Sequence, residues 1–311
     1  MPDFDVIVVG EVCVDLILSG NVEPRFGQVE QIVDDSVLTI GSSSAIFACG
    51  AARLGVKVAF IGKIGDDTFG YFMRDSLAAR GIDVTGIVVD PEIKTGISVI
   101  LSRGADRAIL TYLGSISALR FDEVDQTLIS RARHLHLGSY FLLQDLQPDI
   151  PRLFALAKGN RLTTSLDTNY DPQRTWDSGL RNTFSYVDYF MPNETEIHGI
   201  TGLTDTEAAL NQLAKELMVV AVKRGSSGAL AQSGADVVSA PALPVAVQDT
   251  TGAGDTFDAG FIYGMLSGWK LSQALKLGSI CGSLSTRGLG GTGAQPDLEE
   301  ALQYLPKEPQ G

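Results

Sequence analysis

A glycine-containing stretch in the C-terminal third of the chain combines an anion-binding turn with an acidic side chain. Gly252-Ala253-Gly254 immediately precedes an apolar helical segment that continues to Leu266. Backbone N–H groups in the first turn of a helix have no intrahelical acceptor, and the helix dipole adds positive partial charge there, so this turn predicts an anion hole. Asp255 follows directly, where its carboxylate would repel a bound phosphate.

The pairing of an anion hole with a carboxylate indicates phosphoryl transfer to a hydroxyl. Asp255 would accept the proton of the attacking hydroxyl, while the glycine turn stabilises charge on the transferring phosphoryl group. The alternative is an ordinary helix N-terminus, in which Thr251 is the cap, the glycines turn the chain and Asp255 complements the dipole. The stretch alone leaves both interpretations open.

Length and composition indicate a globular protein with one main domain. The chain has 311 residues, of which 44% are hydrophobic, and this is enough for one large core. A net charge of −13 argues against nucleic acids and anionic membranes as partners. Cys13, Cys49 and Cys281 are odd in number and far apart, which fits neither a disulfide framework nor a zinc cluster. Without a basic leader or a membrane-length apolar run, we expect a cytoplasmic protein.

Segments typical of strands alternate with segments typical of helices, which predicts an α/β fold. Residues 5–10 form a continuous apolar run, as in a parallel strand buried on both faces. Gly10 is not followed by the further glycines of a dinucleotide fingerprint, which argues against NAD binding there. Further strands are predicted at 31–40, 57–64, 82–89, 134–138, 163–169 and 219–223, and helices at 45–54, 65–77, 253–266 and 271–286.

The α/β rhythm pauses at a hairpin signature between residues 95 and 114. Two alternating segments flank a turn at 103–106, without an intervening helix. Together with residues 12–40, this segment predicts a small separate sheet, and we hypothesise that it is a lid. Asp15 and Gly41 would then lie where the lid joins the main sheet, a usual place for a binding cleft. By itself, Asp15 is interpreted as a solvated strand residue, with binding of substrate hydroxyls as the alternative.

Several polar residues at the ends of predicted strands have both a structural and a functional interpretation. Asn169 ends a predicted strand, and strand C-terminal ends are where open α/β sheets bind ligands, although a plain turn explains it too. Asn193 and Glu196 have the spacing of a capping box, and the same pair could hold water around Mg²⁺. Lys223 precedes a glycine turn that either connects a hairpin or approaches a nucleotide.

Two histidines share one face of a predicted strand. His134 and His136 are two residues apart, so a metal pair is conceivable. No third ligand is suggested nearby in the sequence, and core or surface histidines are therefore the favoured interpretation.

Together, these motifs resemble the ribokinase-like (PfkB) carbohydrate kinases from Val6 to about Leu302. Residues 249–257 look like the C-terminal signature of that family, and residues 193–196 look like its Asn-x-x-Glu motif. Residues 222–228 are similar to its nucleotide-binding turn, and residues 65–70 to its Gly-x-Asp-x-x-Gly segment. The motifs occur in the expected order and in the expected structural contexts.

The resemblance implies a three-layer αβα ribokinase-like fold with a mainly parallel central sheet and a small β-sheet lid, within one kinase domain over residues 1–311. The implied activity is ATP-dependent phosphorylation of a hydroxyl of a sugar or sugar-like alcohol. Asp255 would be the catalytic base and the Gly252–Gly254 turn the anion hole. Lids in this family can pair, so a homodimer through the lid is also implied.

The remaining site residues implied by the resemblance fall into three groups. The acceptor sugar would be bound by Asp15, Gly41, Ser42 and Asn169. ATP and Mg²⁺ would be bound by Asn193, Glu196, Lys223, Gly225 and Gly228, with Glu196 holding Mg²⁺ through water. A monovalent cation, K⁺ in the simplest case, would bind beside Asp249 and Thr251, and the glycine-rich loop at 288–293 would complete its site.

The chain departs from the family pattern around the acceptor. Ser42 replaces the second glycine of the N-terminal signature, and Ile46 replaces an Asn that often bonds sugar hydroxyls, which argues against a ribose-like binding mode. Asp171 stands where some keto-acid sugar kinases carry an Arg, which disfavours an anionic sugar acid. A nucleoside kinase of the same fold and a non-catalytic sugar- or nucleotide-binding protein are the alternatives.

Overall fold

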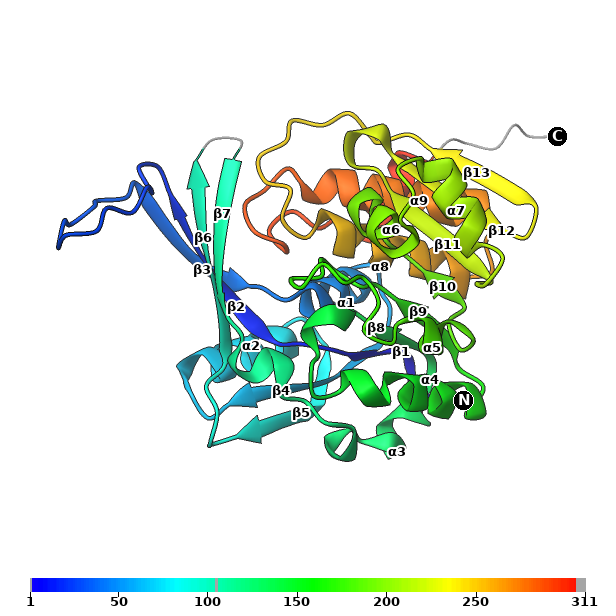
Figure 1. Ribbon diagram of the computed structural model, residues 1–311, viewed down its shortest axis with the longest axis horizontal. Coiled ribbons are helices and arrows are strands. Elements are labelled where there is room, and N and C mark those ends of the chain that lie inside the picture. Colours follow the sequence, from blue (N-terminus) through cyan, green and yellow to red (C-terminus); the bar gives the residue numbers. More distant parts are fainter. Residues whose placement is uncertain (1, 104–105, 306–311) are drawn as a thin grey trace.

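The computed structural model describes residues 2–103 and 106–305 and contains two sheets (Figure 1). The larger sheet is parallel from β11 to β5, and β12 and β13 extend it as antiparallel strands. Its strands, in spatial order, are β13 (Asp236–Ala240), β12 (Ala229–Ser233), β11 (Val219–Lys223), β10 (Tyr189–Phe190), β9 (Thr163–Leu166), β8 (Ala132–Leu137), β1 (Phe4–Val9), β4 (Val58–Gly65) and β5 (Asp83–Asp90).

Helices cover both faces of this sheet, so the fold has three layers. The side chains of β1 show why its sequence is continuously apolar, since Val6 and Val8 belong to one core and Ile7 and Val9 to the other. One core contains side chains of α1 (Ser43–Arg53), α2 (Thr68–Ala78), α8 (Ala253–Leu266), α9 (Leu271–Ser285) and α10 (Leu298–Gln303). The other contains side chains of α3 (Gln126–Ile129), α4 (Ile150–Gly159), α5 (Arg181–Phe184), α6 (Glu194–Thr201) and α7 (Thr206–Leu213).

The three-layer α/β architecture confirms the predicted fold class. Most predicted elements appear within one or two residues of their expected ends, but the strand predicted at 163–169 ends at Leu166. The helix expected from residue 45 begins at Ser43, because the Ser42 side chain accepts a hydrogen bond from the N–H of Ala45 at 3.0 Å. Short 3-10 helices connect other elements: η1 (Gly114–Ser117), η2 (Phe121–Glu123), η3 (Tyr140–Leu142), η4 (Gln147–Asp149) and η5 (Gly225–Ser227).

The small sheet has four strands and lies beside the main body, at the left of the view in Figure 1. Its spatial order is β3 (Asp35–Ile40), β2 (Cys13–Ser19), β6 (Gly96–Arg103) and β7 (Asp106–Tyr112). The strand expected at 31–40 begins only at Asp35, and the predicted turn at 103–106 includes residues 104 and 105, which lie outside the described residues. The action of this sheet as a lid remains a prediction.

The two strand histidines are core residues, as the favoured interpretation predicted. Ser165 Oγ lies 2.7 Å from His134 Nε2 and 2.8 Å from His136 Nδ1. His136 also stacks on Phe47, with ring centroids 3.6 Å apart. In residues 2–103 and 106–305, no three His, Cys, Asp or Glu side chains are grouped as metal ligands, and no helix there has the length and apolarity to cross a membrane.

Candidate active site

Helix α8 begins without a side-chain cap. Its N-cap is Gly252, in a left-handed conformation with φ 70°, and this cap makes no side-chain hydrogen bond. The alternative in which Thr251 is the cap is therefore wrong, because its hydroxyl donates to Asp249 Oδ1 at 2.7 Å. Since the first-turn N–H groups of a helix attract anions, the turn has the features of an anion hole.

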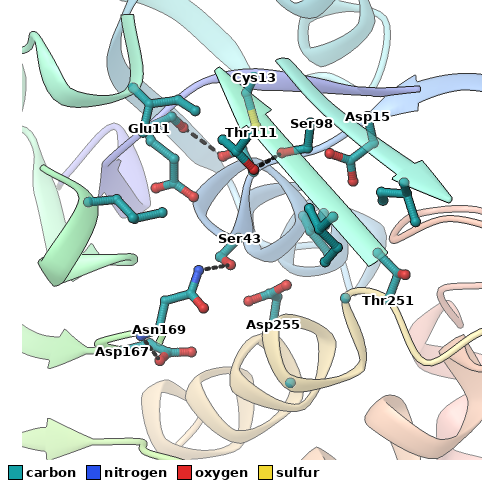
Figure 2. A pocket seen from close by; sticks show the side chains of 18 of the residues that line it. Glu11, Cys13, Asp15, Ser43, Ser98, Thr111, Asp167, Asn169, Thr251 and Asp255 are labelled. Carbon is teal, nitrogen blue, oxygen red and sulfur yellow. Dashed lines mark hydrogen bonds between the residues drawn. The ribbon is translucent and has the colours of Figure 1, made fainter. Parts of the chain in front are cut away.

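Asp255 lies in this first turn and lines a cavity with Gly252 and Gly254 (Figure 2). Burial raises the pKa of its carboxyl well above the ordinary value, and the negative charge of Asp167 adds to this effect. The positive charge of Lys223 acts in the opposite direction. A carboxylate with a raised pKa is a stronger base, so its environment suits proton acceptance.

Two cavities meet at the N-terminus of α8. The first has a volume of about 380 Å³ and lies between this helix and the small sheet. The second, of about 620 Å³, lies on the other side of the turn. Both are lined by Asn193 and Gly254. A group bound at Gly254 would therefore be in reach of ligands in both cavities.

Nearly all the residues predicted for the site line these two cavities. The first cavity is lined by Asp15, Ser42, Asn169, Asn193, Glu196, Thr251, Gly252, Gly254 and Asp255. The second is lined by Asn193, Lys223, Gly225, Gly228, Ala253 and Gly254. Gly41 and Asp249 are not among the lining residues; they contact residues that are.

Asp15 is a buried side chain of the small sheet and faces the first cavity (Figure 2). It is 6% exposed, so the interpretation as a solvated strand residue is wrong. Burial raises its pKa to about 7, although the nearby Arg107 charge acts to lower it. Gly41 is needed beside it, because a Cβ at this position would lie 2.6 Å from Asp15 Cγ.

Asn193 and Glu196 form the predicted capping box at the start of α6. The Glu196 N–H donates to Asn193 Oδ1 at 3.0 Å, and the Asn193 N–H donates to Glu196 Oε2 at 2.9 Å. Glu196 is 3% exposed, and burial raises its pKa to about 7. Each carboxylate oxygen still has lone pairs directed elsewhere, so the pair fits a role in holding water around Mg²⁺.

Lys223 lies at the wall between the two cavities, beneath the glycine turn. Its Nζ lies 2.7 Å from Asp167 Oδ2 and 3.0 Å from Asp258 Oδ2. A Cβ at Gly254 would lie 3.6 Å from this nitrogen. Burial acts to lower the pKa of Lys223, but the two carboxylates raise it overall, so the side chain is a permanent cation close to the anion hole.

The second cavity has an apolar wall that suits a flat aromatic ligand. The glycine turn after Lys223 is both a hairpin connection between β11 and β12 and a lining of this cavity, so both predicted roles are compatible. Gly228 adopts φ 83°, and a Cβ there would lie 2.8 Å from the Ala242 nitrogen. The apolar lining residues are Ala242, Leu243, Pro244, Val245, Val247 and Phe257.

Asp249 joins the α8 turn to the glycine-rich loop. Its Oδ1 accepts from the N–H and hydroxyl of Thr251, and its Oδ2 accepts from the Gly290 N–H at 2.9 Å. Arg107 of the small sheet approaches from the cavity side, with Nη1 2.6 Å from Thr251 Oγ1 and 3.5 Å from Asp249 Oδ1. Its guanidinium occupies one side of the predicted cation site.

The departures from the family pattern have structural reasons. Ile46 lines the first cavity and packs against the backbone of Gly252 and Gly291, neither of which has room for a Cβ. The absence of a side chain at Gly291 therefore accommodates Ile46. Asp171 does not line either cavity; its carboxylate accepts bonds from the N–H groups of its own loop, including Trp176 at 2.7 Å. The sequence argument against an anionic acceptor thus loses its basis.

Sequence reasoning missed several residues of the site. Glu11, Ser43 and Arg107 line the first cavity, and Asp258 pairs with Lys223. Arg107 had a usable signal, because it alternates with Ile109 and Thr111 along one strand and all three face the cavity. Glu11 follows the first strand directly, at the carboxyl end where open sheets bind ligands.

Comparison with known proteins identifies the family. The profile described as pfkB family carbohydrate kinase matches residues 3–298. The chain belongs to this family. It is accordingly a carbohydrate kinase, a conclusion that its relatives support. The Bacillus subtilis (strain 168) protein named 5-dehydro-2-deoxygluconokinase is 29% identical over 318 residues, covering 97% of this chain and 96% of the relative.

Two further proteins are similar to nearly the whole chain. A protein of the same name from Listeria monocytogenes serotype 4b (strain CLIP80459) is 30% identical over 316 residues, covering 96% of this chain and 94% of the relative. A crystal structure of a ribokinase II from E. coli, in complex with ATP and Mg²⁺, has a TM-score of 0.86 and 26% identity, covering 97% of this chain and 98% of the other.

Proposed function

We propose that this pfkB protein transfers the terminal phosphoryl group of ATP to a hydroxyl of a sugar, with Asp255 as the base. The observation that supports this best is the position of the Asp255 carboxylate, which faces the first cavity at the uncapped start of α8. Gly254 lines both cavities, so a phosphoryl group at this turn would lie between donor and acceptor.

In this proposal, the acceptor occupies the first cavity. Asp15 accepts bonds from sugar hydroxyls, with Ser42 beside it, and the reacting hydroxyl gives its proton to Asp255. The N–H groups of the Gly252–Gly254 turn, of which that of Ala253 also donates to the Thr250 carbonyl at 3.3 Å, take up negative charge as the phosphoryl group moves, and the Lys223 ammonium supports them from below.

The second cavity is the proposed nucleotide site. The purine would lie along its apolar wall, beside Gly225 and Gly228, with the phosphates directed toward Lys223. Asn193 and Glu196 would hold the hydration shell of Mg²⁺, which neutralises charge on the phosphates when bound. The E. coli neighbour crystallised with ATP and Mg²⁺ supports the choice of these two ligands.

A sugar acid of the 5-dehydro-2-deoxygluconate class is the acceptor that we propose to test first. Two similar proteins carry the name of a kinase for this compound. Arg107 gives the first cavity a guanidinium, which binds carboxylates in a two-pronged geometry, and Asp171 is outside the cavity. The Arg107 side chain is 39% exposed, so a ligand can reach it.

The same proposal includes a K⁺ site and a homodimer. K⁺ would bind on the Gly290 side of Asp249, since Arg107 is on the other side. A homodimer would form through the outer face of the small sheet, where Leu110 and Tyr112 are 60% and 53% exposed.

An acceptor panel tests the proposal. ADP release would be measured with 5-dehydro-2-deoxygluconate, gluconate, fructose, ribose and adenosine. We expect the highest kcat/KM with the sugar acid, and we expect Arg107→Gln to raise KM for the sugar acid more than for fructose. Preference for adenosine would favour the nucleoside kinase alternative. ATP binding without ADP release for any acceptor would favour a non-catalytic binding protein.

A further inference from the structure

Residues 65–70, which connect β4 to α2, line neither cavity and have no part in the proposed function. Asp67 is the N-cap of α2, and its Oδ1 accepts from the Gly70 N–H at 2.8 Å. Its other oxygen, Oδ2, accepts from the Thr95 N–H at 2.7 Å. Thr95 directly precedes β6, so one carboxylate joins a helix of the main body to the small sheet.

Thr95 is the residue on which this segment converges. It is 2% exposed, and its hydroxyl accepts from the Gly65 N–H at 2.9 Å. A Cβ at Gly65 would lie 2.8 Å from the Thr95 nitrogen, and a Cβ at Gly70 would lie 2.8 Å from the Thr95 hydroxyl. The aspartate and the two glycines of the segment are therefore all needed for contacts with one residue.

The tie between Asp67 and Thr95 is a charge-assisted hydrogen bond. Burial acts to raise the pKa of Asp67, but the N–H donors of Thr95 and Gly70 lower it overall, so the side chain is a carboxylate at neutral pH. Hydrogen bonds to an ionised acceptor are about twice as strong as neutral ones. The anchoring of Thr95 is accordingly strong for a contact between a side chain and the backbone.

The far end of the β6–β7 hairpin is joined to the same point. β6 begins at Gly96, whose N–H donates to Ser115 Oγ at 3.2 Å, and the Ser115 N–H donates to the Lys94 carbonyl at 2.9 Å. A Cβ at Gly96 would lie 2.7 Å from the Leu113 carbonyl oxygen, so the chain that leaves β7 passes beside the chain that enters β6. The position of Thr95 thus sets where both strands join the main body.

Three residues after Thr95, the small sheet faces the first cavity. Ser98 lines this cavity and is paired with Asp15 of β2 on one side and with Thr111 of β7 on the other. The hydroxyls of Ser98 and Thr111 are 3.0 Å apart. Figure 2 shows the three side chains at the cavity. Because the strands are hydrogen bonded in register, a displacement at Thr95 would move all three relative to α8.

We infer that Asp67 is a positioning residue for the acceptor. By holding Thr95, it fixes the small sheet at the separation from Asp255 that the acceptor requires. The inference rests on the proposed function, in which the acceptor lies between the small sheet and Asp255. Loss of the tie should affect the acceptor more than ATP, because the second cavity is lined from other parts of the chain.

Asp67→Ala tests this inference, with Asp205→Ala as the matched control. Asp205 caps α7 in the same way, accepting from the Ala208 N–H at 2.7 Å, but α7 packs on the opposite face of the main sheet. We expect both variants to lower the melting temperature. Only Asp67→Ala should raise KM for the best acceptor, by about 10-fold, with KM for ATP changed less than about threefold. Equal acceptor KM values in the two variants would overturn the inference.

Two variants of Thr95 repeat the test with the cap of α2 intact. Thr95→Val removes the hydroxyl that accepts from Gly65, and Thr95→Ser keeps it. We expect acceptor KM to rise in Thr95→Val and to stay near the wild-type value in Thr95→Ser. If Asp67→Ala does not fold, these two variants decide, and equal acceptor KM values in them would contradict the inference.

A distance measurement tests the anchoring without any acceptor. Spin labels would be attached through Ser36→Cys on β3 and Ser130→Cys on the main body, both at exposed positions. The native cysteines are buried and would remain unlabelled: Cys13, Cys49 and Cys281. We expect a broader distribution of label-to-label distances with Asp67→Ala than with Asp205→Ala.

The distance measurement and the acceptor panel together separate this inference from the proposed function. If the distance distribution does not broaden while the panel identifies an acceptor, only the inference about Asp67 fails. If the distribution broadens but no acceptor releases ADP, the proposed function fails, and the role of Asp67 in acceptor positioning fails with it.

Discussion

The ammonium of Lys223 lies 2.7 Å from the carboxylate of Asp167, on the wall that separates the two cavities. Asp258 completes the pairing from α8, one turn after Asp255. Burial raises the pKa of Asp258 well above its ordinary value, and the negative charge of Asp167 adds to this effect. The Lys223 ammonium thus links the ends of β9 and β11 to helix α8.

Removal of this cation should destabilise the fold. Lys223→Met leaves a buried carboxylate without a counter-charge, and we expect the free energy of unfolding to fall by about 3–5 kcal/mol. Asp258→Asn is the matched comparison: it should cost less, because Lys223 and Asp167 stay paired. Urea denaturation of the three proteins measures both effects. A Lys223→Met protein as stable as wild type would show that the pairing has no net stabilising role.

Gly252 should be irreplaceable for two separate reasons. Its φ of 70° disfavours other residues, and a Cβ would lie 2.7 Å from Gly291 Cα and 2.8 Å from Ile46 Cγ2. Gly268 has a similar φ of 76° but open space around it, so Gly268→Ala isolates the cost of the conformation alone, about 1–2 kcal/mol. We expect Gly252→Ala to destabilise the protein more than Gly268→Ala and, unlike it, to lower kcat. Equal effects of the two substitutions on thermal unfolding and kcat would contradict the described packing.

Asp15 should make sugar binding depend on pH. Its pKa is about 7, so sugar KM should increase as the pH falls through this value and the carboxylate is protonated. Asp15→Asn should raise KM about 10- to 100-fold, corresponding to ~1.5–3 kcal/mol for a charged hydrogen bond, and should remove the pH dependence. Arg107→Gln should move the midpoint to higher pH, because the Arg107 charge lowers the pKa of Asp15. If the midpoint of the pH dependence of sugar KM is the same in Arg107→Gln and in wild type, Asp15 is excluded as the titrating group.

The raised pKa of Asp15 also predicts that the stability of the protein depends on pH in the absence of substrate. The folded-state pKa of Asp15 lies above the unfolded value of 3.8, so its stabilising contribution is complete below pH 3.8 and is lost as the pH rises to about 7. Asp15→Asn should therefore gain thermal stability relative to wild type between pH 5 and pH 8. If the difference in thermal stability between Asp15→Asn and wild type does not change from pH 5 to pH 8, Asp15 is not protonated in the folded protein.

Contiguous motifs were predictable from the sequence because their residues cooperate locally. The Gly252–Gly254 turn and the Asn193–Glu196 capping box are each formed within one helical turn, so spacing alone indicates their geometry. The fold class was predictable for a similar reason, since continuous apolar strands such as β1 have to be covered on both faces.

The residues that sequence reasoning missed have partners far along the chain. Glu11 and Ser139 are 128 positions apart, and Arg107 and Thr251 are 144 positions apart. No periodicity encodes such contacts, which arise only when the sheets assemble. Asn169 was located correctly at the cavity, but its side-chain contacts are with residues that only the folded chain brings together.

Turnover of Asp255→Asn tests the central claim most directly. Asparagine has the shape of aspartate but cannot accept the hydroxyl proton, so folding should be preserved while kcat for sugar-dependent ADP release falls by about 10²–10⁴-fold. Thermal unfolding close to that of wild type would establish that the loss is chemical. An Asp255→Asn enzyme that turns over its best sugar acceptor at the wild-type rate would contradict the assignment of Asp255 as the base.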